Sequence, residues 1–364
     1  MDMTWVEVDT KAILHNVKEA RRMLGRGVKI CAIIKDNAYG HGLIPIAKIL
    51  QKGGVECLGI GDISEAIELR KNGIKLPVLN IVSAFPFQAK DIVSYGISQS
   101  VSDLGIVREL DKEAKKQKTT AKVHIEIDTG MGRLGLTSEN FEDFFSKVRK
   151  FSNIKVEGVF THLSSADDNP SYTWKQISDF EYASFLVPES IIKHVLNSSG
   201  VINFSGAGFD MVRPGLMIYG LHLDKKEEKV VKLKPALSWK TKVLFVKNCK
   251  KGSSISYGNT YRTKKDTKIA VLGVGYGSGY NRLLSNSGEV LISGKKYPVA
   301  GRVCMDLIMT DLGKSSKVKA GDTAVLIGKS KNNIISAEEL AAKCKTIPYE
   351  IICAIKKDVK RVYV

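Results

Sequence analysis

Short apolar runs alternate with amphipathic stretches through the first two-thirds of the chain. The apolar runs are rich in β-branched residues and are bounded by turn-forming residues, which is typical of buried strands. The stretches between them carry apolar residues at helical spacing. We expect eight strands in this part of the chain, at 28–35, 55–61, 77–82, 97–101, 122–128, 156–162, 193–199 and 210–217.

The first amphipathic stretch illustrates the helical pattern. Its apolar residues recur three or four positions apart at Ile13, Val17, Ala20 and Leu24, and Asp9 or Thr10 precedes it as a cap. Eight strand–helix units in roughly 220 residues are typical of a TIM barrel. A doubly wound open sheet is the alternative for the same alternation of strands and helices.

The pattern changes near residue 230, where a polar, lysine-rich segment interrupts it. Short strands and glycine-rich turns follow, and the helical pattern returns only at 335–344. We therefore expect an α/β chain with an N-terminal (β/α)8 TIM barrel over 9–230 and a mostly-β domain over 231–364, which the early strand 1–8 joins.

Composition is consistent with this division. The chain has 364 residues, of which 43% are hydrophobic, so it exceeds the usual size of one domain and can form a sizeable core. Its net charge is +18, but the lysines are scattered, so we expect neither nucleic-acid binding nor membrane binding.

The N-terminal segment and the cysteines indicate a cytoplasmic protein. The first ten residues carry two acids and no apolar core, so no signal peptide is expected there. No apolar run is long enough to span a membrane. The six cysteines lie in apolar runs without metal-ligand spacing, so we expect reduced, buried thiols and no metal site.

The segment IIKDNAYGHG is the first candidate for chemistry. Lys35 follows an apolar strand, and barrel active sites lie at the carboxyl ends of strands. Apolar neighbours are expected to lower the pKa of this lysine, which suits Schiff-base chemistry. A lysine at a strand end is more commonly just solvated, but Gly40 and Gly42 permit tight backbone, and Tyr39 and His41 add two polar rings.

This segment resembles the cofactor-lysine motif of the alanine racemases, which are fold-type III enzymes that use pyridoxal 5'-phosphate. The resemblance implies that Lys35 holds the cofactor as a Schiff base and that Tyr39 contacts its phosphate. Similar motifs occur in order along nearly the whole chain. KVHIEIDTGMGRLG resembles the family segment that implies Arg133 beside the cofactor 3-hydroxyl, and THLSSAD the one that implies His162 against the pyridine ring.

Two further segments resemble the parts of the family that bind the phosphate and the ring nitrogen. LNSSG implies a phosphate-binding turn with Asn197 and Ser198. RPGLMIYG implies that Arg213 faces the pyridine nitrogen, while the backbone N–H groups of Gly215 and Leu216 bind the phosphate. Because an arginine can only donate, the ring nitrogen is expected to stay unprotonated.

The later motifs resemble those of the β domain in the family. SYGNTY implies Tyr257 as the catalytic tyrosine. VGYGSGYNR, GRVCMDL and IPYEIIC correspond to motifs carrying Tyr276, Met305, Asp306 and Tyr349. Of these, Tyr349 is expected to contact the cofactor, and the backbone N–H of Met305 is expected to receive the substrate carboxylate.

Racemisation needs a base on each face of the α-carbon, because one group cannot easily remove a proton from one side and return it from the other. Lys35 and Tyr257 are the expected pair, and Arg133 assists at the substrate carboxylate. In the family the tyrosine comes from a second subunit. The resemblance therefore implies a head-to-tail homodimer with shared active sites.

One residue departs from the family pattern. Many family members have a carbamylated lysine where this chain has Glu126, seven residues before Arg133. A glutamate would supply a carboxylate directly, so we expect Glu126 to pair with Arg133. The alternative is a Glu126 that faces solvent near the end of its strand.

The resemblance implies interconversion of L- and D-alanine, which supplies D-alanine for peptidoglycan. The alternatives are a racemase of broader specificity, for example for serine, a fold-type III decarboxylase, and a non-enzymatic cofactor-binding protein of this fold. Other features are weaker indications: GVGYGSG lacks the surroundings of a nucleotide site. His124 on its predicted strand is more consistent with a structural role. No residue lies at a spacing from His194 that would indicate a functional partner.

Overall fold

The computed structural model describes residues 3–364. Within that range, eight parallel strands close into a barrel in chain order, so the TIM-barrel prediction is confirmed and the open sheet was the wrong alternative. All eight predicted strands are present: β2 (Lys29–Ile33), β3 (Cys57–Ile60), β4 (Val78–Asn80), β5 (Ser98–Val101), β6 (Ala121–Glu126), β7 (Ile154–Phe160), β8 (Ile192–His194) and β9 (Met211–Val212).

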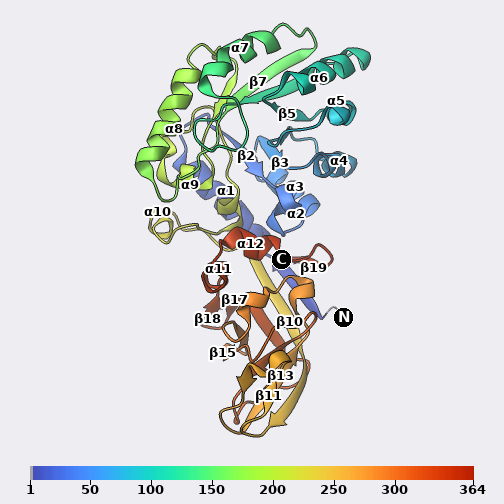
Figure 1. The fold of residues 1–364 in the computed structure, drawn as a ribbon, viewed down its shortest axis with the longest axis vertical. Coiled ribbons are helices and arrows are strands. Elements are labelled where there is room, and N and C mark those ends of the chain that lie inside the picture. The colour runs from blue at the N-terminus through green and yellow to red at the C-terminus, as the bar shows by residue number, and fades with distance from the viewer. Residues whose placement is uncertain (1–2) are drawn as a thin grey trace.

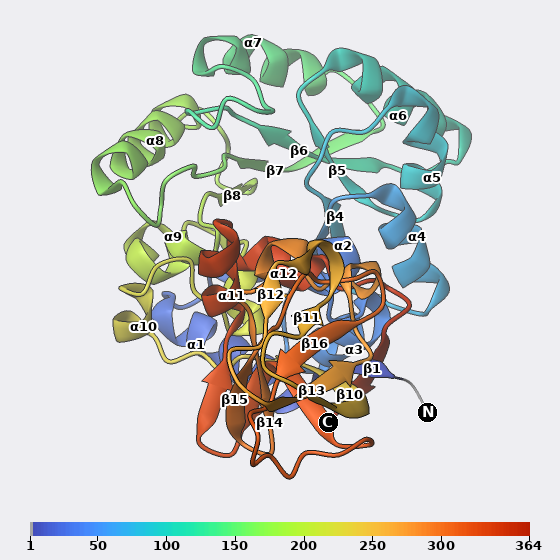
Figure 2. The same cartoon turned by 60° about the horizontal axis from the view of Figure 1, so that its bottom comes forward.

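Helices cover the outside of the barrel (Figure 2). The first begins as the sequence predicts, because the Asp9 side chain accepts the backbone N–H groups of Lys11 and Ala12, each at 2.9 Å. The helices of this part are α1 (Thr10–Met23), α2 (Lys35–Tyr39), α3 (Leu43–Lys52), α4 (Ile63–Lys71), α5 (Ala89–Ser94), α6 (Leu104–Lys116), α7 (Ser138–Val148), α8 (Pro170–Ala183), α9 (Ser198–Asn203) and α10 (Glu227–Val230).

The second part is built on a sheet of mostly antiparallel strands, whose main path runs β15-β14-β17-β10-β1-β19. Its elements are β1 (Thr4–Val8), β10 (Leu237–Cys249), β11 (Ser254–Ile255), β12 (Tyr261–Arg262), β13 (Thr267–Leu272), β14 (Glu289–Ile292), β15 (Lys295–Pro298), β16 (Ile308–Asp311), β17 (Thr323–Ser330), β18 (Asn333–Ile335), α11 (Ala337–Cys344), α12 (Pro348–Cys353) and β19 (Lys360–Tyr363).

The early strand joins this sheet as expected. β1 runs antiparallel to β10 and parallel to β19. Residues 1 and 2 of the predicted strand lie outside the described residues. Trp239 of β10 is 1% exposed, and its indole Nε1 donates to Thr4 Oγ1 at 2.9 Å, so the first strand is fixed to the sheet by side chains as well as by the ladder.

Helix α12 lies between the barrel and the sheet, against α2 of the barrel (Figure 1). One continuous hydrophobic core extends from the barrel into the sheet. The predicted burial of the cysteines is only partly right: Cys31, Cys57 and Cys344 are buried, whereas Cys353 is exposed. No described helix combines the length and the apolar character needed to span a bilayer.

Candidate active site

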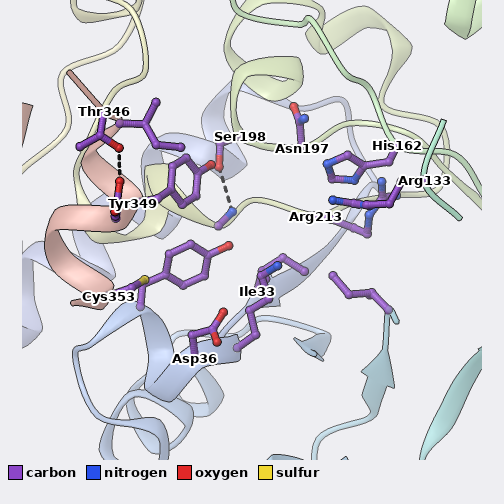
Figure 3. A pocket seen from close by; sticks show the side chains of 16 residues that line it. Ile33, Asp36, Arg133, His162, Asn197, Ser198, Arg213, Thr346, Tyr349 and Cys353 are labelled. Atoms are coloured by element: carbon purple, nitrogen blue, oxygen red, sulfur yellow. Dashed lines mark hydrogen bonds between the residues drawn. The ribbon is translucent and has the colours of Figure 1, made fainter. Parts of the chain in front are cut away.

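The carboxyl ends of the barrel strands open onto a cavity of about 570 Å³. This is the end at which barrel enzymes place their active sites. Figure 3 shows Arg133, His162 and Arg213 gathered on one side of the cavity, and Ser198, Thr346 and Tyr349 on the other. The lining residues are Ile33, Lys35, Asp36, Tyr39, Ile81, Arg133, His162, Asn197, Ser198, Arg213, Gly215, Thr346, Ile347, Tyr349, Glu350 and Cys353.

Lys35 enters this cavity from the loop after β2. The strand itself ends at Ile33, and Lys35 begins α2. The aliphatic stem of Lys35 lies close to Gly61, where a Cβ would come within 3.3 Å of Lys35 Cδ. The chain after the lysine therefore determines how its side chain is presented.

Helix α2 is a left-handed turn. Residues 36–39 have φ between 52° and 56°, in the left-handed region. This conformation costs roughly 1–2 kcal/mol for each residue other than glycine, so neighbouring contacts have to hold it. The N–H of Asn37 donates to Glu65 Oε1, and Asn37 Oδ1 accepts the N–H of Leu43, each at 2.9 Å.

Arg213 is the most constrained cation of the site. It is 2% exposed. Its Nη1 donates to His194 Nδ1 at 2.8 Å and to the His194 carbonyl at 3.0 Å, and its Nη2 donates to the carbonyls of Thr161 and Val195 at 2.6 and 3.1 Å. Within residues 3–364, only its Nε–H remains without a partner among the guanidinium donors. Burial lowers the pKa of Arg213 to about 10, so it stays charged near neutral pH.

The hydrogen bond from Arg213 to His194 determines which ring nitrogen carries the proton in His194 and in His124. Because Arg213 can only donate, His194 Nδ1 must accept, and a neutral His194 carries its proton on Nε2. His194 Nε2 lies 2.8 Å from His124 Nδ1, which must then accept in turn. Burial lowers the pKa of His124 to about 4 and that of His194 well below its usual range, so both rings stay neutral.

The opposite side of the cavity carries hydroxyl groups. Ser198 Oγ accepts the backbone N–H of Gly215 at 2.9 Å and that of Met217 at 3.3 Å, which leaves its own hydrogen free to donate. A Cβ on Gly215 would lie 2.6 Å from Tyr39 Oη, so glycine is needed there for the phenol to approach the backbone. Burial raises the pKa of Tyr39 well above its usual range and keeps it a donor.

His162 lies among the cations of the site. Burial lowers its pKa to about 3, and Arg213, Arg133 and Lys35 add to the effect. The imidazole is therefore neutral and can pack against a flat ring without adding charge. Arg133 is exposed on the loop after β6 and reaches the same cavity.

Glu126 does not form the predicted ion pair. Among the described residues, no ion pair within 4.0 Å joins Glu126 to Arg133. The carboxyl is 5% exposed, so the solvent-facing alternative is also wrong. Burial raises the pKa of Glu126 to about 7 against the opposing effects of Arg213 and Arg133.

Several predicted residues do not line this cavity. Leu216 is buried directly behind Gly215. Tyr257, Tyr276 and Met305 belong to the second part of the chain and are 69%, 41% and 56% exposed. Asp306, next to Met305, likewise lies outside the lining residues.

Parts of the site were not predicted from the sequence. Thr346, Glu350 and Cys353 line the cavity beside the predicted Tyr349. Glu350 and Cys353 share α12 with Tyr349, so helical spacing could have indicated them, whereas Thr346 lies in the turn before that helix. His194 and His124 were not predicted to belong to the site, but they form the network behind Arg213. No local signal identifies them, because they meet only when β6, β8 and β9 come together in the closed barrel.

Comparison with known proteins agrees with this geometry. Residues 8–223 match the model of the alanine racemase N-terminal domain, and 236–363 that of the C-terminal domain. The alanine racemase of Halothermothrix orenii is 41% identical over 365 residues, covering 99% of this chain and 96% of the relative.

Solved structures give the same result. The alanine racemase of Clostridium difficile 630 superposes with a TM-score of 0.95 at 34% identity, covering 100% of this chain and 96% of that one. An alanine racemase from Bartonella henselae with covalently bound pyridoxal phosphate has a TM-score of 0.89 at 26% identity, with 100% of each chain covered. With both domain models matched, the barrel closed and the lysine at its mouth, the chain belongs to the alanine racemase family.

Proposed function

We propose that this protein interconverts L- and D-alanine with pyridoxal 5'-phosphate held on Lys35, using Lys35 and Tyr257 as the two bases. The observation that carries the proposal is the cavity at the barrel mouth, which Lys35 lines together with two guanidinium groups and several hydroxyl groups. We further propose that the protein is cytoplasmic, supplies D-alanine for peptidoglycan, and divides into a barrel over 9–230 and a β domain over 231–364 with strand 1–8.

The donors in the cavity fit the acceptors of this cofactor. The phosphate has acceptors only, and the hydroxyls of Ser198 and Tyr39 supply donors on one side of the cavity. We propose that the N–H of Leu216, next to Gly215 of the cavity lining, adds a further donor. The pyridine nitrogen accepts one hydrogen bond, and Arg213 has one N–H left on the other side. We propose that Asn197, His162, Arg133 and Tyr349 complete the cofactor site.

When bound, the cofactor supplies a conjugated ring that accepts electron density from the α-carbon of the substrate. With the cofactor bound, Arg213 would donate to the ring nitrogen and leave it unprotonated, which would limit that electron demand and disfavour side reactions. Lys35 removes or returns the α-proton on one face. Tyr257 does so on the other, while Arg133 and the N–H of Met305 hold the carboxylate.

The position of Tyr257 supports a shared active site. Its segment follows β11, at the end of the molecule away from the barrel (Figure 1). Tyr257 is 69% exposed and does not line the cavity of its own chain. A head-to-tail homodimer, in which Tyr257 of the partner subunit covers the cavity, would bring the two bases together.

Solvent-deuterium exchange tests the assignment of the bases. Wild type with either enantiomer of alanine should incorporate deuterium at the α-carbon and form the other enantiomer. Lys35→Ala should lose the visible absorbance of the bound cofactor together with activity. Tyr257→Phe should slow abstraction of the α-proton from one enantiomer far more than from the other. If the variant abstracted the proton from both enantiomers at wild-type rates, Tyr257 would not be a base.

Mixing two inactive variants tests the dimer. Lys35→Ala and Tyr257→Phe chains, unfolded together and refolded in equal amounts, should recover about a quarter of wild-type activity, because half of randomly paired dimers carry one intact site. If both bases came from one chain, no mixture would regain activity. Each variant refolded alone is the control.

A further inference from the structure

The left-handed turn that carries Lys35 is held from outside by a strand of the β domain. The turn continues from α2 through Gly40, His41 and Gly42 into α3. Its own backbone hydrogen bonds run from Gly40 N–H to the Asp36 carbonyl at 3.1 Å and from His41 N–H to the Ala38 carbonyl at 3.0 Å.

The carbonyls of Gly40 and His41 bind outside the turn. In the part of the chain that the structure describes, each accepts one hydrogen bond, and both donors lie on β19. Arg361 Nε donates to the Gly40 carbonyl at 3.0 Å, and Tyr363 Oη donates to the His41 carbonyl at 2.9 Å. Residues more than 300 positions apart in the sequence therefore meet at this turn.

The strand is itself firmly seated. β19 pairs in parallel with β1, so Arg361 lies beside Val6 and Tyr363 beside Val8. The Arg361 guanidinium also donates to the carbonyls of Ile355 and Lys357, each at 3.1 Å. Burial lowers the pKa of Arg361, but the usual pKa of an arginine is so high that the guanidinium remains a charged donor.

The turn is shaped to accept the strand. Gly42 has a φ of 101°, and a Cβ on it would lie 2.0 Å from Tyr363 Oη. Only glycine allows the phenol to reach the neighbouring carbonyl. Burial raises the pKa of Tyr363, which keeps its hydroxyl protonated and able to donate.

We propose that β19 braces the cofactor-lysine turn, with Arg361 and Tyr363 as positioning residues for Lys35 and Tyr39. The two bonds hold the far end of a strained turn whose near end presents Lys35 and whose middle presents Tyr39 to the cavity. Without them the turn is free to relax toward right-handed backbone, which would move both side chains. The inference rests on the proposed function, because it concerns the placement of the proposed base.

The test compares Tyr363→Phe and Arg361→Lys with Val362→Ala. Tyr363→Phe removes one hydroxyl, and Arg361→Lys keeps the charge but loses the planar donors. Val362 lies on the same strand between them, is 37% exposed, and serves as the matched control. Hydrogen–deuterium exchange of the peptide covering residues 36–42 is measured in holoenzyme and apoprotein, together with the cofactor dissociation constant and alanine kinetics.

For Tyr363→Phe we expect about fivefold faster exchange in residues 36–42, which matches the net value of one hydrogen bond. Cofactor affinity and kcat should fall by a similar factor, while the KM for alanine and the exchange of distant peptides stay near wild type. Arg361→Lys should act in the same direction, and Val362→Ala should change none of these quantities.

Wild-type exchange of residues 36–42 in both Tyr363→Phe and Arg361→Lys would overturn the brace. So would faster exchange there with unchanged cofactor affinity and kcat, because the bonds would then be structural only. An equal effect of Val362→Ala would also overturn the brace, because any weakening of β19 would then disturb the turn and the two hydrogen bonds would not be responsible. None of these results bears on the proposed function, which fails instead if wild-type holoenzyme does not racemise alanine.

Discussion

Glu126 gives the sharpest quantitative test of the site. It is a buried carboxyl that faces Arg213, Arg133, Asp128 and Ser100. Its pKa in the folded protein is raised, chiefly by burial, from 4.5 to about 7. Glutamine has nearly the shape of glutamate but no charge, so we expect Glu126→Gln to stabilise the protein at alkaline pH. If Glu126 were paired with Arg133, the same substitution would destabilise it.

The sign follows from proton binding. A carboxyl whose pKa is higher in the folded state binds its proton more tightly there, so it favours folding at low pH and loses that contribution as the pH rises from 4.5 through about 7. A tenfold change in proton affinity is about 1.4 kcal/mol. The full difference is about 3 kcal/mol, reached above pH 7.

Unfolding free energies of wild type and Glu126→Gln, measured by denaturant titration of apoprotein between pH 5 and pH 8, test this expectation. The variant should gain about 2–3 kcal/mol on wild type across this range. Glu157→Gln is the control, because Lys122 and Ser98 outweigh burial and lower the pKa of Glu157. This variant should be less stable than wild type by an amount that does not change between pH 5 and pH 8. A Glu126→Gln protein less stable than wild type at pH 8 would refute the reasoning and restore the ion pair with Arg133.

Substitutions at three other positions test the packing of the site and of the β domain. His124→Leu should lower the unfolding free energy by about 1–3 kcal/mol, because it leaves the Nε2–H of buried His194 unpaired, whereas His124→Gln keeps an acceptor and should lose less. Gly215→Ala should weaken cofactor binding about tenfold or more in an absorbance titration, since its Cβ would lie 2.6 Å from Tyr39 Oη, and wild-type affinity would contradict the close approach. Trp239→Ala should cost about 3–5 kcal/mol in urea unfolding with little change in the cofactor spectrum of the folded fraction, and a loss below about 1 kcal/mol would show that this side chain is not a core residue.

The sequence alone was sufficient for the architecture. Strand and helix periods depend on neighbouring residues, so the eight barrel strands and the cap at Asp9 could be predicted from local pattern. Motif order was sufficient for the candidate site as well, because barrel topology gathers the carboxyl ends of the strands. Lys35, Arg213 and Ser198 accordingly line one cavity.

Only the tertiary structure decided how these residues are held. His124 and His194 are 70 positions apart and meet because the barrel closes, which no local spacing encodes. Tyr363 reaches the turn after Lys35 only because β19 pairs with β1. The resemblance implied an ion pair for Glu126, because it stands where many family members have a carbamylated lysine. Burial depends on all the surrounding side chains, and desolvation rather than pairing controls the charge of Glu126.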